Sequence, residues 1–312
     1  MTADYHVPVL VREACEFLIT DPDGIYVDAT LGGGGHAMAV LSRLGSEGRL
    51  IGIDRDADAI RTMNGRIHEG ERRLHLVHGA FGDMETWVAG LRFHRVHGVL
   101  FDLGVSSRQI DDPGRGFSYL TDGPLDLRMD TRSGLRASDI VNGFSEKALA
   151  DLFYRYGEER RSRAIAAAVV EARAEGSIET TGRLAEAVRR RAPGRWQVKT
   201  LARVFQALRI EVNDELGQLA KGLAAAARLL APGGRLVAIT YHSLEDRLVK
   251  RFFRPAAPDT RRTPIQTRAE ETGFQMLTKK VVRPSREEIK ANPRARSAKL
   301  RASEKLEAFP SP

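Results

Sequence analysis

The chain of 312 residues is 42% hydrophobic and 29% charged, which is ordinary for a globular protein of about two domains. Its single cysteine, Cys15, excludes an internal disulfide framework and a zinc site built from several cysteines, and we expect no metal. The net charge is +8, and neither a secretory signal nor an apolar run long enough for a membrane span is visible, so we expect a cytoplasmic protein.

Roughly the first hundred residues alternate between strand-like and helix-like patterns. The predicted strands are 25–29, 50–53, 74–77 and 96–101, and the predicted helices are 36–44 and 57–67. Asp56 is placed to cap the second of these helices. Apolar strands that alternate with helices predict an α/β fold with a parallel, doubly wound sheet.

A long insertion interrupts this pattern. The next sheet strand, 235–240, follows a Pro-Gly-Gly turn and lies far beyond Asp102, whereas one crossover needs only a few tens of residues. Residues 111–129 are aperiodic and predict a structured loop. Helices are predicted at 148–156, 161–174 and 183–191, and from 199 to 230 with a break near 211–214. We therefore place a helical substrate-recognition domain at 110–209 and a discontinuous core domain at 1–109 and 210–312.

The end of the chain completes the predicted sheet. A basic amphipathic helix runs to Phe253, a loop follows at 254–273, and two strands are predicted at 274–282 and 298–306. Two late strands that form an antiparallel pair beside a parallel sheet favour a seven-stranded, mostly parallel class I (Rossmann-like) methyltransferase fold over an all-parallel dehydrogenase.

A ligand site is predicted at the end of the first strand. Asp28 is followed by four glycines, Gly32 to Gly35, and these let the backbone pass close to a ligand. Asp54 ends the second strand at the spacing from which an acid reaches ribose hydroxyls. The ligand could be a dinucleotide or S-adenosylmethionine, and the order of acid and glycines favours the methyl donor. Asp102 ends the fourth strand and is expected at the same crevice, either as a functional group or as a structural cap.

The sequence resembles the bacterial MraW-type 16S rRNA (cytosine N4)-methyltransferases over nearly its whole length. The resemblance rests on long motifs that occur in one order, namely 6–10, 28–36, 53–56, 78–81, 101–107, 115–118, 122–130, 241–247 and 292–301. It implies methyl transfer to the exocyclic N4 of a decoding-region (P-site) cytosine. By matching motif positions, it also assigns the S-adenosylmethionine site to Gly34, Gly35, His36, Asp54, Phe81, Asp102 and Gln109.

The chemistry of an exocyclic cytosine amine requires a hydrogen acceptor, because its lone pair is delocalised into the ring. Asp102 is the leading candidate as amine acceptor or as organiser of the donor site, and His242 and Asp246 are second choices. The chain lacks the Pro-Pro-aromatic motif of DNA amino-methyltransferases after Asp102. The aromatic ring that stacks the base must therefore come from elsewhere, and the candidates are Tyr241, Phe117 and Tyr119.

Cys15 precedes the first strand, whereas the nucleophile of a C5-methyltransferase follows a later one, so its position favours N-methylation. Basic residues predict a polyanion partner. The stretches 247–268 and 279–305 carry net charges of +6 and +7, and the predicted insertion helices are rich in Arg beside Trp196. The residues expected to contact RNA are Arg115, Tyr241, Arg294, Arg296, Lys299 and Arg301.

Three other functions remain open at this point. They are methylation of a protein or small molecule, an RNA-binding assembly factor without turnover, and a nicotinamide dehydrogenase. The expected partner is 16S rRNA in an assembled or late-assembling 30S subunit. The sequence does not give the oligomeric state and is compatible with a homodimer.

Overall fold

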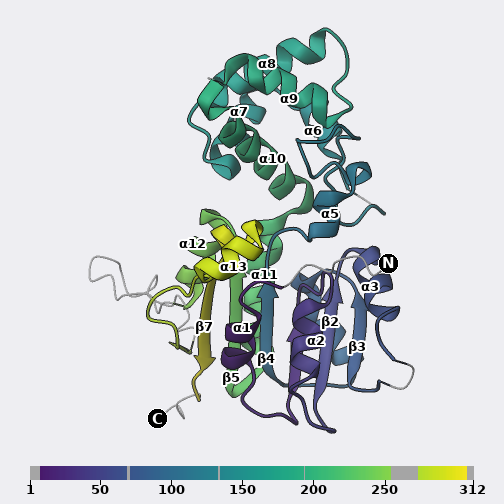
Figure 1. Cartoon of the computed structure of the whole chain (residues 1–312), viewed down its shortest axis with the longest axis vertical. Helices are drawn as coiled ribbons and strands as arrows, with labels where there is room; N and C mark the ends of the chain where they lie inside the picture. The colour runs from purple at the N-terminus through teal and green to yellow at the C-terminus, as the bar shows by residue number, and fades with distance from the viewer. Residues whose placement is uncertain (1–7, 69–70, 133, 193, 254–272, 308–312) are drawn as a thin grey trace, which may run out of the picture. The chain divides into compact units, whose positions relative to one another are not determined.

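The computed structural model describes residues 8–68, 71–132, 134–192, 194–253 and 273–307. The predicted loop at 254–273, except for Gly273, and the first residues of the N-terminal motif, His6 and Val7, lie outside these ranges. The chain divides into two compact units (Figure 1). We call residues 1–104 and 217–312 the core unit and residues 105–216 the insertion unit.

The core unit is built on a seven-stranded sheet in the order β3-β2-β1-β4-β5-β7-β6. Its strands are β1 (Ile25–Asp28), β2 (Arg49–Asp54), β3 (Leu74–His78), β4 (Val96–Asp102), β5 (Leu230–Thr240), β6 (Phe274–Met276) and β7 (Lys299–Lys305). The first five strands are parallel, and β7 runs antiparallel to both β5 and β6. The predicted mostly parallel sheet with a late antiparallel pair is confirmed.

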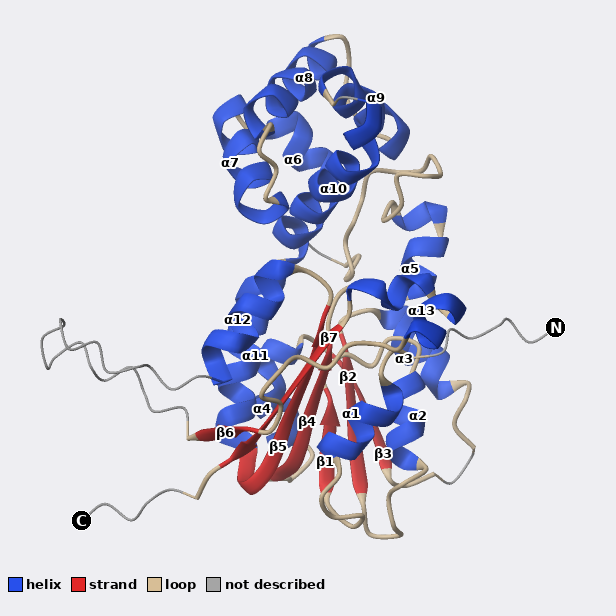
Figure 2. Cartoon of the chain, turned by 60° about the vertical axis from the view of Figure 1, so that its left-hand side comes forward, coloured by secondary structure: helices blue, strands red, loops and turns tan. Residues whose placement is uncertain are grey.

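Helices cover both faces of this sheet (Figure 2). One face packs against α1 (Val11–Leu18), α2 (Gly35–Leu41) and α3 (Ala57–Asn64), and the other against α4 (Met84–Gly90), α11 (Glu215–Leu229) and α12 (Ser243–Phe253). The short elements η1 (Phe81–Asp83), α13 (Arg286–Ala291) and η4 (Pro293–Ser297) complete this unit. Burial on both faces explains why the parallel strands read as nearly continuous apolar runs. No helix in the described ranges is long and apolar enough to cross a membrane.

Two strand ends differ from the prediction. β5 begins at Leu230 rather than at residue 235, because Leu230 pairs with Val96 before a register shift lets Arg235 pair with Gly98. β6 stops at Met276 rather than at residue 282. The Thr278 hydroxyl accepts the Ala302 N–H at 3.1 Å, and this side-chain bond takes the place of a ladder hydrogen bond. Only an isolated bridge at Val282 follows in the described part of this segment.

The insertion unit is helical. It contains α5 (Ser107–Asp111), η2 (Pro113–Arg115), α6 (Ala137–Gly143), α7 (Glu146–Gly157), α8 (Ser162–Ala174), α9 (Thr181–Arg191), η3 (Gly194–Trp196) and α10 (Gln197–Asn213). Ser145 and Thr180 cap α7 and α9 through their hydroxyl groups, and apolar faces such as those of Phe153 and Val204 form a separate core. The predicted helix break is confirmed at Asp214, whose φ of 47° ends α10.

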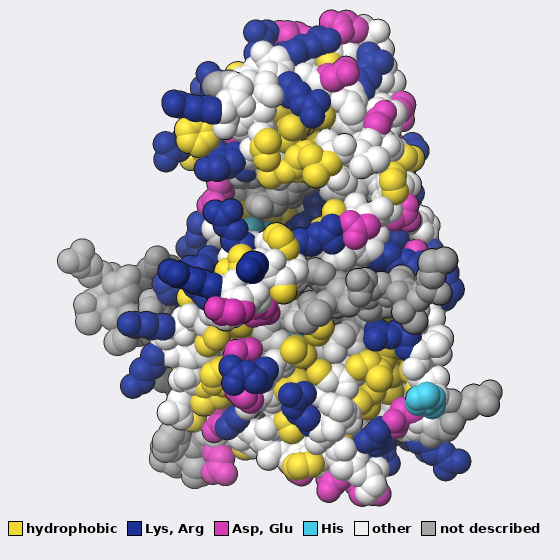
Figure 3. Space-filling model, in the orientation of Figure 1, with side chains coloured by type: hydrophobic (Ala, Val, Ile, Leu, Met, Phe, Trp, Pro, Cys, Tyr) yellow, Lys and Arg dark blue, Asp and Glu magenta, His cyan; other side chains and the backbone are white. Residues whose placement is uncertain are grey.

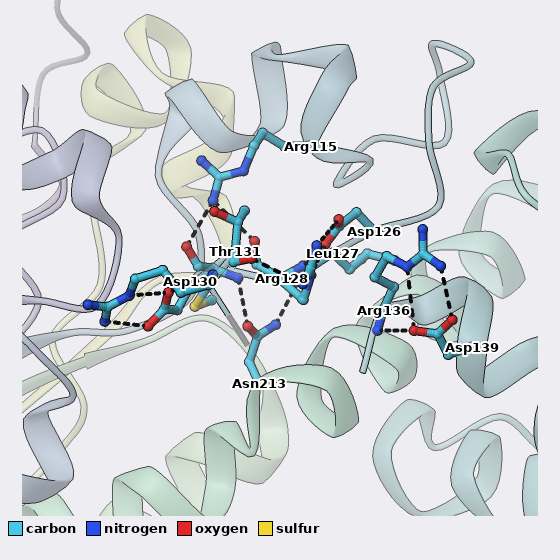
Figure 4. Close-up of polar contacts among 11 residues, drawn as sticks. Arg115, Asp126, Leu127, Arg128, Asp130, Thr131, Arg136, Asp139 and Asn213 are labelled. Carbon is cyan, nitrogen blue, oxygen red and sulfur yellow. Dashed lines mark hydrogen bonds and ion pairs between the residues drawn. The ribbon is translucent and has the colours of Figure 1, made fainter. Parts of the chain in front are cut away.

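Polar side chains fix the predicted loop at 111–129 (Figure 4). Asn213 at the end of α10 accepts the Met129 N–H at 2.8 Å and donates to the Leu127 carbonyl oxygen at 2.8 Å. Asp126 forms a bidentate ion pair with Arg128. The loop is therefore ordered by side-chain hydrogen bonds rather than by regular secondary structure.

Candidate active site

The glycine-rich segment after β1 leaves the sheet and starts α2. Gly32 and Gly34 have φ values of 50° and 76°, in the left-handed region that residues with side chains rarely adopt. A Cβ at Gly34 would also overlap the Met63 sulfur. The segment thus requires glycine at position 34 and presents bare backbone at the carboxyl end of β1.

Asp54 ends β2, the neighbour of β1. Its carboxylate accepts hydrogen bonds from the loop after β1 and from the loop after β2. Oδ2 accepts the Gly32 N–H at 2.7 Å, and Oδ1 accepts the Asp56 N–H at 2.8 Å. Burial raises the pKa of Asp54 to about 6, although both hydrogen bonds oppose the shift. Because each carboxylate oxygen has two lone pairs, Asp54 keeps acceptor capacity for ligand hydroxyl groups.

Asp28 ends β1 and is buried. Its Oδ1 accepts the Thr30 N–H at 3.2 Å, whereas no donor among the described residues forms a hydrogen bond with Oδ2. Burial raises the pKa of Asp28 to about 6, and the nearby His36 partly offsets this effect. A buried carboxylate oxygen without a donor is unfavourable. This atom is therefore a candidate contact for a cationic group of a ligand.

His36, Asp102 and Tyr241 form a polar network at the same edge of the sheet. The Tyr241 hydroxyl donates to Asp102 Oδ1 at 2.9 Å, and His36 Nδ1 lies 3.4 Å from Asp102 Oδ2. His36 Nε2 lies 3.0 Å from the Val9 carbonyl oxygen, so the buried ring faces an acceptor on each side. The ring donates to both acceptors only when both nitrogens carry protons. Asp102 is further held by its own N–H, which donates to Thr30 Oγ1 at 2.6 Å.

Phe81 and Gln109, which the motifs assign to the donor site, lie in different units. Phe81 follows β3, and its ring packs edge-on against Phe101 with the centroids 5.4 Å apart. Gly222 on α11 leaves room for this ring, because a Cβ there would lie 2.7 Å from it. Gln109 belongs to the insertion unit, where it forms a capping box with Ser106 at the start of α5.

Comparison with known proteins identifies the family. A model of the MraW methylase family matches residues 3–306. The chain belongs to the MraW methylase family. Proteins named "Ribosomal RNA small subunit methyltransferase H" are similar to it over 97% of its length. The relative from Prosthecochloris aestuarii is 48% identical with 95% of its own length covered, that from Methylorubrum extorquens (strain PA1) is 49% identical with 88% covered, and that from Parabacteroides distasonis is 47% identical with 98% covered.

Family membership confirms the resemblance drawn from the motifs and the predicted class of enzyme. The nicotinamide dehydrogenase alternative is not supported. Cys15 of this MraW methylase lies buried on α1, and burial raises the pKa of its thiol, which makes it a poor nucleophile.

His242, a predicted proton acceptor of this methylase, is engaged by Glu245 at the start of α12. The backbone N–H of His242 donates to Glu245 Oε2 at 3.2 Å, and the ring Nε2 of His242 lies 3.0 Å from Glu245 Oε1. Its Nδ1 in turn accepts the Glu245 N–H at 3.4 Å. Both ring nitrogens therefore face the same residue of the first helical turn, and a role for His242 in proton transfer stays a prediction.

Asp246, the other second choice, accepts hydrogen bonds from Arg301 Nε at 2.8 Å and Lys299 Nζ at 3.3 Å. Burial opposes the effect, but the two cations hold the pKa of Asp246 below its usual value and make it a weaker base. Arg301 is only 7% exposed and forms an ion pair with Asp246, and its predicted contact with RNA stays a prediction. Arg294 and Arg296 in η4 are exposed and stay predicted RNA contacts.

Arg115 lies in the ordered loop of the insertion unit (Figure 4). Its Nη2 donates to the carbonyl oxygens of Arg128 at 3.1 Å and Met129 at 2.9 Å. Its guanidinium also lies 5.9 Å from the ring centroid of Phe117. These contacts give Arg115 a structural role in the loop, and its predicted contact with RNA is untested.

The three aromatic candidates for base stacking differ in their surroundings. Phe117 is buried in the insertion core, and Tyr119 packs edge-on against Phe205 with the centroids 5.4 Å apart. Tyr241 lies instead at the edge of the core sheet, where its ring adjoins Gly104. Ordinary packing therefore accounts for the first two, and Tyr241 remains the best placed.

Thr30 and Glu245 organise this site, and sequence reasoning did not single them out. Thr30 contacts both Asp28 and Asp102 through its backbone and its hydroxyl. Glu245 stands three residues after His242, the spacing of a capping box, which is a signal that the sequence does contain. The Thr30 contact has no such signal because it depends on which strands are neighbours.

Proposed function

We propose that this chain transfers a methyl group from S-adenosylmethionine to the exocyclic N4 amine of a decoding-region (P-site) cytosine in 16S rRNA. Membership of a methylase family and relatives named for the small-subunit rRNA support it. The observation that carries it is a row of carboxylates. Asp54, Asp28 and Asp102 end the three adjacent parallel strands β2, β1 and β4, beside the glycine segment.

The residues at this edge suit S-adenosylmethionine, which carries an ammonium group, a sulfonium and two ribose hydroxyls. The open Oδ2 of Asp28 would accept from the ammonium, and its negative charge would be balanced there. Asp54 would accept from the ribose hydroxyls. Gly34, Gly35, His36 and Phe81 would line the donor, and the assignment of Gln109 to the donor site stays a prediction from its motif. When bound, the donor supplies a methyl group activated by its bond to a positively charged sulfur.

Asp102 is proposed to receive the hydrogen that the amine must lose. As the nitrogen–methyl bond forms and the sulfur–methyl bond breaks, the amine nitrogen becomes positive and releases one proton. Asp102 can accept it because the carboxylate is fixed at the strand end by Tyr241 and His36. His242 and Asp246 are weaker proposals, since Glu245 and the two C-terminal cations respectively engage them.

The insertion is proposed to recognise the RNA, together with exposed basic residues such as Arg294 and Arg296 on the core unit. The proposed substrate is an assembled or late-assembling 30S subunit, and the proposed location is the cytoplasm, where that particle forms. A homodimer remains a prediction without support from the described residues.

Radiolabelled methyl transfer tests this function. The chain is incubated with labelled S-adenosylmethionine and with 30S subunits, naked 16S rRNA or bulk ribosomal protein, and the RNA is digested to nucleosides. We expect label in N4-methylcytidine at one site. Asp102→Asn should reduce the rate at least about a hundredfold, as loss of a general base does, whereas the exposed Asp151→Asn should not change it.

Label on protein would sink the proposal. Binding of donor and RNA without any transfer would instead indicate an assembly factor, and label at C5 of a pyrimidine would overturn the assignment to the amine.

A further inference from the structure

Four helices of the insertion unit meet at one edge. Arg161 at the start of α8 donates to the Arg191 carbonyl oxygen at the end of α9 at 3.0 Å. Arg203 on α10 pairs with the buried Glu159, just after α7, at 3.3 Å. The end of α7 also packs closely on α10, because a Cβ at Gly157 would lie 2.7 Å from the Arg203 carbonyl oxygen. The ends of α7 and α9, the beginning of α8 and the first half of α10 are therefore neighbours.

Exposed cations gather at this edge, and Figure 3 shows Lys and Arg side chains clustered on the left-hand side of this unit. We call the exposed set the basic edge, which comprises Arg160, Arg161, Arg163, Arg189, Arg195, Trp196 and Lys199. Acids are present too, but Glu159 is buried against Arg203, and Glu171 and Glu175 are paired with Arg191 and Arg190. Glu158 and Glu186 are exposed acids at or near these helix ends, and they are outnumbered by the exposed cations. The surface is therefore strongly positive.

Trp196 is the unusual member of the basic edge. It is 44% exposed, although a large aromatic ring is normally buried, and it does not belong to the hydrophobic core of its unit. The Arg195 guanidinium lies 5.3 Å and the Lys199 ammonium 5.1 Å from its ring. Trp196 thus offers an exposed aromatic surface for stacking, with two phosphate-binding cations close to it.

We propose that the basic edge is an RNA-anchoring surface, at which a base of a single-stranded segment stacks on Trp196 while Arg195 and Lys199 bind the adjacent phosphates. It rests on the proposed function, because the RNA would be the 16S rRNA substrate. Base stacking on an aromatic ring is stronger than an exposed cation–π contact, so a base can replace a cation on the ring and leave that cation for a phosphate. An acidic protein would use the cations but would gain little from the ring.

The test measures binding of the intact chain to a labelled single-stranded RNA of about a dozen nucleotides, within the range that such surfaces cover, and to a duplex of the same sequence. Trp196→Ala should weaken single-strand binding about tenfold. Trp196→Phe should keep most of the affinity but lose the RNA-induced quenching of tryptophan fluorescence. Leu135→Ala removes another exposed apolar side chain of this unit and serves as the matched control.

The charges are tested by salt dependence. Arg195→Ala and Lys199→Ala should each reduce the slope of log Kd against log salt by about 0.7, the value for one phosphate bound on a single strand. Arg72→Ala, an exposed cation of the core unit, should leave it unchanged. Unaltered affinity in Trp196→Ala, or quenching by duplex equal to that by the single strand, would overturn the proposal. Because binding is measured without methyl transfer, failure of the proposed activity would be seen separately.

Discussion

Asp28 is a buried carboxylate whose Oδ2 is a candidate contact for a cationic group of the ligand. Substitution of Asp28 should therefore change donor affinity and protein stability in opposite directions. Asp28→Asn removes the charge while keeping the shape, so we expect donor affinity to fall about ten- to a hundredfold, as for loss of a charged hydrogen bond. Calorimetric titration with S-adenosylmethionine measures this. Asp151→Asn on the exposed face of α7 is the control, and an unchanged affinity in Asp28→Asn would contradict the assignment.

The same substitution should stabilise the unliganded protein. The pKa of Asp28 rises from 3.8 to about 6 on folding, chiefly through burial. The ionised form is therefore disfavoured in the folded state, and stability falls as pH rises from about 4 to about 6. A shift of this size corresponds to about 3 kcal/mol. Unliganded Asp28→Asn should thus be more stable than the wild type at pH 8 and similar to it near pH 4, which thermal unfolding at the two pH values would show.

Tyr241 supports Asp102 through one hydroxyl group. Burial and the neighbouring Asp102 raise the pKa of Tyr241, so the hydroxyl stays a donor at all working pH values. Tyr241→Phe leaves the carboxylate with less stabilisation of its negative charge, and protonation becomes easier. The acidic limb of the kcat profile should therefore move to higher pH, so the substitution lowers the rate more at the acidic end of the profile than at the alkaline end. Tyr154→Phe, which removes an exposed hydroxyl, should not move it.

Individual acids of the site could be predicted from the sequence, whereas their contacts could not. Asp28, Asp54 and Asp102 each follow an apolar strand, and the parallel pattern places all three at one edge. Tyr241 also follows a predicted strand, but its hydrogen bond to Asp102 exists because β5 lies next to β4 in the sheet. Strand order is a property of the whole sheet and leaves no local signal.

At the scale of elements, Asp246 joins α12 to β7 through Arg301 and Lys299. Asp246→Asn would leave the buried Arg301 without its anionic partner, and unfolding free energy should fall by about 1–3 kcal/mol. The kcat measured well below the unfolding temperature should stay near that of the wild type. The opposite pattern, with intact stability and a rate lowered a hundredfold, would show that Asp246 accepts the proton. Chemical denaturation and single-turnover rates measure the two quantities.

The bounds of the predicted elements are accurate where a periodic apolar pattern continues over many residues. They are less accurate where a side-chain hydrogen bond ends the element. The α7, α8 and α9 helices lie within a few residues of their predicted ranges because each has a periodic apolar face that is buried. β6 is shorter than predicted because the Thr278 hydroxyl replaces a backbone partner, and an apolar run alone gives no warning of that.

At the scale of the molecule, the length of the connection after Asp102 was enough to predict an inserted unit. The compact units divide at 104/105 and 216/217, against predicted boundaries at 109/110 and 209/210. Side chains account for the difference. The Ser106 capping box starts α5 inside the insertion, and α10 continues to Asn213, whose side chain holds the insertion loop. Composition and hydrophobic periodicity carry no signal for such interactions between residues that are distant in the sequence.

Charge acts at this scale as well. The net charge of +8 is concentrated towards the C-terminus, so RNA binding should release counterions and weaken steeply with salt. Donor binding rests on a few buried groups and should change little. We expect kcat/KM for RNA, but not the KM for S-adenosylmethionine, to fall by an order of magnitude or more between 50 and 200 mM salt. Replacing Arg294 and Arg296 by Gln should lower the logarithmic slope by about 0.7–0.9 for each phosphate that the variant no longer neutralises. Arg72→Gln is the control, and a slope unaffected by the double substitution would place the RNA elsewhere on the surface.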